Sequence, residues 1–551
     1  MQATSTPSAR ASAWKVLLAD WKFIGGIILL ALILSSLPYI FANATTPSDL
    51  QFMGIAQNAP DSGEYFAWMR ESMRGFFISN TLTPEPNPPA FFNLVFWLLG
   101  RLALYTGMSL AQVYQVLRVI GGAGFLLAAY YLCAIFFADR LQRRLAFLLI
   151  TFGSGFSLYF AILGKFSAIK FTAQFVSEGT TLYSMISFPL LLVGAALFTT
   201  ILALAFRAYE TQRQGFAIVA GVLGFILGWS HGYDLILVYA VLAAFSLIVL
   251  LRDGWAWRWI VSVGLIGILS ITPSLYNVWL TRTNDTWRES LAQFVNAGVF
   301  SPDPLQLILL MGLPLLVAFF AFDKWSPLKS HDPKELFIKT WFVVNFALIY
   351  LPVEYQIHFI NGWQVPIGIL ATIGFFKHVA PALAHWNPIA KISSARQLSI
   401  LAMLFVLVVL PSSIYFVGWR INDLNRHESP YFLQRDQVAA LNWLNAKSAP
   451  GDVTLSAYEI GHYVPGLTGD RAFIAHWAMT LKFFDKQKAV ARFFDTATPD
   501  AERLALLKQF DVQYVYWSDA ERALGSWNPA QAAYLEQVWS APRAAIYRVK
   551  N

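Results

Sequence analysis

The chain has 551 residues, roughly three to four times the length of a typical domain, so we expect more than one structural unit. Apolar residues make up 57% of it and charged residues 13%, and the mean hydropathy is +0.51. A water-soluble protein carries about twice that charged fraction. The composition therefore excludes ordinary cytosolic enzymes, nucleic-acid-binding proteins and disordered proteins.

The charged residues are unevenly distributed along the chain. Residues 420–551 hold 15 Lys or Arg and 14 Asp or Glu and are 22% charged, whereas the preceding 419 residues are 10% charged. Most of the net charge of +8 lies in that earlier part, where basic residues between spans direct membrane insertion. The distribution predicts a long membrane domain followed by a soluble one, with no nucleic-acid partner.

Eleven apolar stretches are long enough to cross a membrane as helices, which takes about 20 residues each. They are 23–42, 114–137, 145–163, 187–206, 215–231, 234–251, 258–279, 304–322, 336–353, 362–380 and 398–418. A tail, 1–22, precedes them, and the first stretch lacks a small-residue cleavage site, so we expect it to be a retained anchor.

The basic residues predict the orientation of these spans. With the tail 1–22 in the cytoplasm, 17 basic residues of the membrane part lie inside and 8 lie outside. The odd number of spans then places residues 420–551 outside the cytoplasm. We therefore expect a transmembrane domain at 23–419, with a long first outer loop at 43–113, and an extracytoplasmic domain at 420–551.

One further apolar segment, 89–107, carries Arg101 near its middle. If it crossed the membrane, the basic loop at 138–144 would move to the outside. We interpret it instead as an amphipathic helix that lies along the outer surface of the bilayer.

The segment 420–551 alternates helical and extended patterns. Helices are predicted at 435–447 and 499–510, and extended runs are DVTLSAYE, RAFIAHW, VQYVYWS and AAIYRVK. Strands that alternate with helices imply a small α/β domain.

The first outer loop concentrates acidic and aromatic residues around Asp61. A carboxylate at the outer membrane surface could act as a general base on a hydroxyl group. Asp61 followed by Glu64 three residues later also has the spacing of a capping box. Two interpretations therefore stay open for Asp61, a helix cap and a catalytic or metal-binding carboxylate, and one residue could do both.

Other polar residues lie at the predicted outer ends of the spans. Glu64 and Glu178 are candidates for a second acidic residue or a metal ligand, and the alternative for Glu178 is an exposed loop residue. Asp234, in the tight turn that begins at His231, either caps the next helix or contacts a ligand at the membrane boundary. Candidates for contact with a lipid phosphate or its surroundings are Arg70, Arg282, Gln356 and His358.

Five segments together resemble the GT-C family of membrane glycosyltransferases, in a bacterial branch of that family. They are PDSGEYFAWMRES, SEGTTLYSMISFPL, GWSHGYDLILVYAVL, YLPVEYQIHFINGWQVPIGILA and GHYVPGLTGDRAFIAHWAMT. The family includes protein O-mannosyltransferases, lipid A aminoarabinose transferases and oligosaccharyltransferases. The likeness lies in the order of the segments, since each alone is weakly specific.

The resemblance implies transfer of a hexose or pentose from a polyprenyl-phosphate donor to a glycan, lipid or protein acceptor outside the cytosol of a bacterial cell, with inversion. It implies that an acidic residue of the first outer loop is the base, and Asp61 occupies that position. Relatives carry paired arginines where this chain has Ile357 and His358, so phosphate binding there departs from the family pattern. The cofactor is left open, with a divalent cation such as Mg or Mn as a candidate.

Two other functions remain as alternatives, a lipid or solute transporter and a non-catalytic membrane assembly subunit. A transporter is expected to show paired broken helices or charged residues at mid-membrane depth, and neither pattern is present in the sequence. A glycosyltransferase relative that has lost activity keeps the same pattern, so the sequence does not separate it from an enzyme.

Overall fold

The computed structural model describes residues 13–164, 176–297, 300–323, 326–329, 332–384 and 393–550. The contacts divide the chain into two compact units, each discontinuous in sequence. Unit 1 contains Met1–Leu37, Arg118–Pro273 and Phe300–Trp419, and unit 2 contains Pro38–Leu117, Ser274–Val299 and Arg420–Asn551. Residues 1–12 of the predicted tail 1–22 lie outside the described residues.

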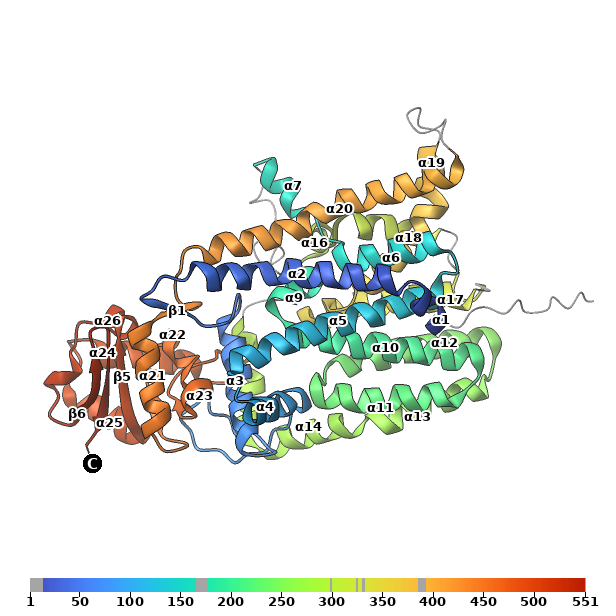
Figure 1. Ribbon diagram of the computed structural model, residues 1–551. Coiled ribbons are helices and arrows are strands. Elements are labelled where there is room, and N and C mark those ends of the chain that lie inside the picture. Colours follow the sequence, from blue (N-terminus) through green and yellow to red (C-terminus); the bar gives the residue numbers. More distant parts are fainter. Residues whose placement is uncertain are drawn as a thin grey trace, which may run out of the picture. The chain divides into compact units, whose positions relative to one another are not determined.

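Unit 1 consists of helices throughout its described part (Figure 1). They are α1 (Ala13–Ala19), α2 (Trp21–Thr45), α5 (Leu110–Phe136), α6 (Arg140–Phe152), α7 (Ser157–Ile162), η2 (Ser177–Gly179), α9 (Thr181–Ser187), α10 (Pro189–Thr211), α11 (Gln214–Ser230), α12 (Asp234–Asp253), α13 (Trp257–Ser270), α16 (Pro304–Phe319), η4 (Phe320–Phe322), α17 (Pro333–Ile349), η5 (Gln356–Ile360), α18 (Gln364–Gly374), η6 (Phe375–Val379), α19 (Ala380–Ala384) and α20 (Ser394–Leu424). Helices α2, α5 and α20 each continue into unit 2.

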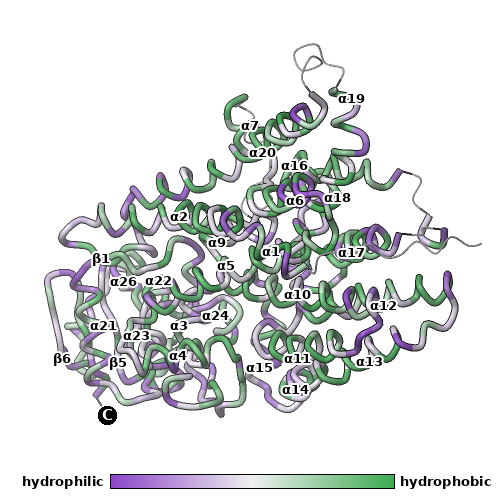
Figure 2. The backbone as a smooth tube through the Cα atoms, turned by 45° about the vertical axis from the view of Figure 1, so that its right-hand side comes forward, coloured by the Kyte–Doolittle hydropathy of each residue, from purple (hydrophilic) through white to green (hydrophobic). Residues whose placement is uncertain are grey.

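Seven helical segments of the described residues are long and apolar enough to span a membrane. They are Trp21–Thr45, Leu110–Phe136, Pro189–Thr211, Asp234–Asp253, Pro304–Phe322, Gln356–Ala384 and Ser394–Leu424. Figure 2 shows that these helices are hydrophobic along most of their length. The chain is therefore a multi-pass membrane protein, as the composition predicted.

Four of the eleven predicted stretches do not form one straight helix of spanning length. Stretch 258–279 is α13 followed by α14 (Thr272–Thr283), a pair bent by 44° that counts as an eighth span if it crosses as one. Stretches 215–231 and 336–353 form helices of 17 residues, α11 and α17. Stretch 145–163 is interrupted between Phe152 and Ser157, where the backbone at Gly155 passes so close to Leu309 that a Cβ would lie 2.1 Å from its carbonyl oxygen.

Buried polar contacts fix α2 within unit 1. Asp20, at the start of α2, is 3% exposed and accepts hydrogen bonds from three arginines and a tyrosine, Arg140, Arg143, Arg144 and Tyr130. Further along, Arg118 of α5 donates to the hydroxyls of Ser35 and Ser36 at 2.9 and 2.7 Å. Polar groups that pair with one another in this way are tolerated inside a membrane.

Unit 2 combines short helices with strands. Its elements are β1 (Leu50–Phe52), α3 (Ala59–Arg74), α4 (Leu94–Thr106), most of α14, α15 (Asp285–Ala292), η3 (Gln293–Ala297), β2 (Phe432–Gln434), α21 (Arg435–Lys447), β3 (Val453–Leu455), α22 (Tyr458–Gly461), α23 (Val464–Thr468), β4 (Arg471–Ala472), α24 (Phe483–Phe494), α25 (Asp500–Gln509), β5 (Val512–Ser518), α26 (Asp519–Leu524), η7 (Pro529–Gln531), β6 (Leu535–Ala541) and β7 (Ala544–Val549).

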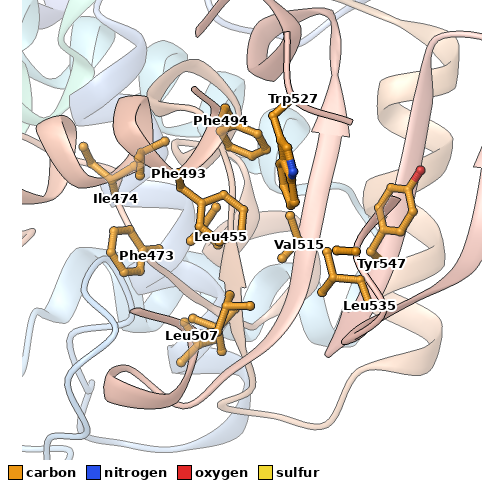
Figure 3. Packing of buried hydrophobic residues seen from close by; sticks show 14 of the residues in the cluster. Leu455, Phe473, Ile474, Phe493, Phe494, Leu507, Val515, Trp527, Leu535 and Tyr547 are labelled. Carbon is orange, nitrogen blue, oxygen red and sulfur yellow. The ribbon is translucent and has the colours of Figure 1, made fainter. Parts of the chain in front are cut away.

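The C-terminal sheet has five strands in the order β4-β3-β5-β7-β6. Strand β3 pairs in parallel with β4 and β5, and β7 pairs antiparallel with β5 and β6. Its core packs strand residues such as Leu455 and Val515 against Phe493, Phe494 and Trp527, as Figure 3 shows. The predicted α/β fold is confirmed, with all four predicted extended runs in the sheet, whereas β6 and the small β1–β2 pair were not predicted.

The segment 89–107 forms a helix as predicted, α4, while its place at the bilayer surface stays a prediction. Asn93 caps its first turn, because the side-chain oxygen accepts from the backbone N–H groups of Val95 and Phe96. Arg101 donates to the carbonyls of Met73 and Gly75 at the end of α3, so its charge caps that helix. The arginine that argued against a membrane span therefore joins α4 to α3.

The predicted first outer loop and the C-terminal segment fold together in unit 2. Strand β1 pairs antiparallel with β2 across 380 residues of sequence. Arg471 donates to the carbonyl of Pro84, and Lys486 forms an ion pair with Glu85 at 2.6 Å. The loop that carries Asp61 is thus built into the same compact unit as the α/β sheet.

Candidate functional site

Asp61 lies in the first turn of α3. The residue before the helix, Asn58, has a left-handed backbone with φ of 51°, and no side-chain hydrogen bond caps the helix there. Pro60 occupies the first turn, where its missing N–H costs no hydrogen bond. Because Asp61 follows the cap position and does not bind the backbone N–H groups, the capping-box interpretation is wrong.

Both oxygens of Asp61 accept hydrogen bonds from neighbouring side chains. Oδ1 lies 3.1 Å from Nε2 of His476, and Oδ2 accepts from Nδ2 of Asn58 at 2.7 Å. The Asp61 side chain is 21% exposed, whereas that of His476 is 2% exposed. Asp61 is therefore a fixed carboxylate that solvent or a substrate can reach.

Glu64, one turn further along α3, is buried beside the same imidazole. Its Oε2 lies 3.6 Å from Nε2 of His476, and its Oε1 has no hydrogen-bond partner in the described part of the chain. Burial, aided by the nearby Asp61, raises the pKa of Glu64 to about 7. Two carboxylates three residues apart thus have different environments, one buried and one partly exposed.

His476 belongs to the segment that follows β4. Hydrogen bonds hold this segment in place: Thr480 Oγ1 accepts from the Ala475 N–H and donates to the carbonyl of Leu82. The sequence pattern placed His476 in a motif of the resemblance but did not pair it with Asp61. No local signal could have done so, because the two residues are 415 positions apart.

Close backbone packing holds α3 against the chain between α22 and α23. A Cβ at Gly63 would lie 2.5 Å from the carbonyl oxygen of His462, so only glycine fits there. His462 is buried, and burial lowers its pKa to about 3, which leaves the imidazole neutral. We call the group of Asp61, Glu64 and His476 the carboxylate–histidine cluster.

Unit 1 contains a second group of predicted residues. His358, in η5, hydrogen-bonds through Nδ1 to Oε1 of Glu178 at 2.8 Å. The His358 ring also stacks on Tyr233, with 5.2 Å between centroids and 21° between planes. Glu178 is buried, so it is a positioned partner of His358 and the exposed-loop interpretation is wrong.

The turn at 231–234 joins this group. His231 Nδ1 lies 2.7 Å from Oδ2 of Asp234, and the Tyr233 hydroxyl bonds to Nε2 of the same imidazole. Asp234 therefore pairs with His231 and does not cap α12, whose cap position is Tyr233. A Cβ at Gly194 of α10 would lie 2.3 Å from Asp234 Oδ2, so glycine allows this turn to pack against α10.

The remaining predicted residues lie apart from these two groups. Arg70, in α3, donates to the side chain of Asn445 and to the carbonyl of Thr468, both structural acceptors within unit 2. Arg282 is exposed near the end of α14. Gln356 begins η5, where its amide faces the carbonyls of Ile349 and Leu351 at 3.3 Å.

The described residues form no ready-made metal site. Within the described ranges, no group of three or more His, Cys, Asp or Glu side chains is arranged to hold one. In the carboxylate–histidine cluster, Nε2 of His476 is hydrogen-bonded to Asp61 and Nδ1 faces two backbone N–H groups. We therefore derive no step through a metal.

Comparison with solved structures identifies the fold. The oligosaccharyltransferase of Archaeoglobus fulgidus tethered with an acceptor peptide matches with a TM-score of 0.56 and 12% identity, over 91% of this chain and 69% of that chain. ArnT from Cupriavidus metallidurans bound to undecaprenyl phosphate matches with a TM-score of 0.50 and 13% identity, over 98% of both chains. Apo ArnT gives 0.52 and 14%, over 96% and 98%.

No protein-family model and no curated protein sequence matches the chain. At these identities the structural likeness concerns the fold. The chain has the polytopic membrane fold of these solved structures, so the fold that the resemblance implied is confirmed.

Proposed function

We propose that this protein is a membrane glycosyltransferase that moves a sugar, a hexose or a pentose, from a polyprenyl-phosphate donor to a hydroxyl acceptor, with Asp61 as general base. The observation that carries the proposal is the Asp61 carboxylate, which is partly exposed and held at both oxygens by Asn58 and His476. The fold supports it, since ArnT was solved bound to undecaprenyl phosphate.

The proposed step forms one bond and breaks another at the anomeric carbon. The acceptor oxygen attacks that carbon while its proton passes to the carboxylate of Asp61. The bond from the anomeric carbon to the phosphate oxygen breaks, and the polyprenyl phosphate leaves with the electron pair. Attack opposite the leaving group inverts the anomeric configuration. A positioned base contributes roughly 10²–10⁴ in rate to such a step.

The departing phosphate requires positive charge or hydrogen-bond donors. Our first candidate is His358, because Glu178 accepts from its Nδ1 and Tyr233 stacks on its ring, so that the imidazole is oriented. When protonated, His358 offers charge and an Nε2–H donor. Arg282 is the second candidate, since it is exposed, whereas Arg70 is occupied by Asn445 and Thr468.

The remaining parts of the proposal concern location and cofactor. We place the protein in the bacterial plasma membrane, with residues 420–551 and the acceptor outside the cytoplasm, because of the basic residues between the spans. The Archaeoglobus oligosaccharyltransferase has been solved with Zn and sulfate, which keeps a divalent cation such as Mg or Mn open as a proposal for this chain. The step above does not use one.

The test is a transfer assay with a readout that does not depend on the sugar. Full-length protein in lipid nanodiscs receives polyprenyl-phosphate sugars extracted from bacterial membranes. Mass spectrometry measures two quantities, the polyprenyl phosphate that co-purifies with the protein and the free polyprenyl phosphate that the reaction releases. We expect co-purified lipid phosphate and release that depends on an added hydroxyl acceptor. Bound lipid phosphate without acceptor-dependent release would support a non-catalytic subunit. The absence of both bound lipid phosphate and release would contradict the proposal.

A further inference from the structure

The two ring nitrogens of His476 have different partners. Nδ1 lies 3.1 Å from the backbone nitrogen of Ala478 and 3.3 Å from that of Met479. A backbone N–H can only donate, so Nδ1 must accept and carries no proton. The ring proton is therefore on Nε2, which faces Asp61. The local fold of the segment after β4 thus fixes the tautomer of this histidine.

A fixed tautomer makes His476 a dedicated donor to the carboxylate. Its Nε2–H donates to Oδ1 of Asp61, while Asn58 donates to Oδ2. Each carboxylate oxygen has a second lone pair, so one donor at each oxygen sets the plane of the group and leaves it able to accept a proton.

The surroundings favour Asp61 over Glu64 as the partner of His476. The distance from Nε2 is 3.1 Å to Asp61 and 3.6 Å to Glu64, and the longer one exceeds a hydrogen bond. His476 is 2% exposed and Asp61 is 21% exposed, so a substrate reaches the carboxylate and not the imidazole.

We propose that His476 is a positioning residue that holds the carboxylate of Asp61 in the orientation for proton abstraction. The proposal rests on the proposed function. It makes the segment 473–480, at the edge of the C-terminal sheet, part of the catalytic machinery through Asp61, although none of its side chains needs to touch the substrate.

A purely structural role is the competing explanation. A buried histidine that accepts from two backbone N–H groups could serve only to hold its own loop. The two roles use different ring nitrogens, so two substitutions separate them. In His476→Asn the side-chain oxygen takes the place of Nδ1 and keeps accepting from the loop, but no donor reaches Asp61. In His476→Gln the amide nitrogen reaches the position of Nε2 and donates to Asp61, but the loop loses its acceptor.

The experiment measures kcat and KM of sugar transfer for the full-length chain in nanodiscs, using polyprenyl-phosphate sugars extracted from bacterial membranes, together with the melting temperature. We expect His476→Asn to lower kcat about 10- to 100-fold with KM within about twofold, because a displaced catalytic group costs rate more than affinity. We expect His476→Gln to keep a kcat within about fivefold of the wild type, even where its melting temperature falls.

The opposite ranking would overturn the positioning role: a normal kcat in His476→Asn, or a loss in both variants that follows the melting temperature. Asp61→Asn, measured in parallel, separates this failure from failure of the proposed function. An inactive Asp61→Asn beside a fully active His476→Asn removes only the role of His476. An active Asp61→Asn removes the base and, with it, the positioning of that base.

Discussion

Replacing Glu64 by glutamine tests how the carboxylate–histidine cluster is charged. Burial raises the pKa of Glu64 from 4.5 to about 7, so the folded protein holds this proton over a pH range in which the unfolded chain has lost it. The free energy of unfolding therefore falls as pH rises from about 4.5 to 7, and the loss is complete above 7. The difference between the two pKa values corresponds to about 3 kcal/mol, at 1.36 kcal/mol per pH unit.

Glutamine keeps the shape of a neutral Glu64 and cannot ionise. We expect the melting temperature of Glu64→Gln in detergent to be close to that of the wild type at pH 5 and several degrees higher at pH 8. Glu428→Gln is the matched control, because it makes the same change in an exposed carboxyl group of unit 2. A difference between wild type and Glu64→Gln that is equal at both pH values would refute the reasoning, since Glu64 would then titrate normally in the folded protein.

Three further predictions follow from the packing, the lipid site and the topology. Gly63→Ala should lower the free energy of unfolding by about 1–3 kcal/mol, because the added Cβ meets the His462 carbonyl. The melting temperature should fall for Gly63→Ala and not for the control Gly26→Ala, which has open space around it, and equal effects would contradict the packing. Glu178→Gln should reduce co-purified polyprenyl phosphate severalfold if Glu178 orients His358, and unchanged lipid would exclude that role. The proposed topology predicts that an impermeant maleimide labels Ala446→Cys and not Gly215→Cys in intact cells. The native Cys133 is buried and should not react, and the reverse labelling would invert the proposed topology.

The spans show how far hydropathy predicts a membrane fold. All seven long apolar helices of the described part were predicted, because an apolar stretch of about 20 residues has few alternatives to a spanning helix. The break in 145–163 was not predicted, because hydropathy carries no information on the close approach of Gly155 to the Leu309 carbonyl. The two 17-residue helices, α11 and α17, lie within four residues of the predicted stretches 215–231 and 336–353, and their length is at the short end of what spans a membrane.

The site shows a different limit of sequence reasoning. Asp61 and Glu64 could be singled out because acidic residues among aromatics are unusual beside a membrane. Their partner His476 could not, because a hydrogen bond across 415 residues leaves no periodic pattern. The same holds for Glu178 and His358, which were both predicted as candidates but not as a pair. The capping interpretations of Asp61 and Asp234 failed for a shared reason, since each carboxylate binds an imidazole instead of a helix N-terminus.

The most direct test of the proposed function is the transfer rate of Asp61→Asn. Asparagine has nearly the size of aspartate and still offers an oxygen to the His476 donor, but it does not accept the proton of the acceptor hydroxyl. Transfer is measured in nanodiscs with polyprenyl-phosphate sugars extracted from bacterial membranes, beside the exposed control Glu428→Gln. We predict a folded variant with transfer lowered at least about a hundredfold, as expected for loss of a general base. Transfer by Asp61→Asn at the wild-type rate would contradict the account.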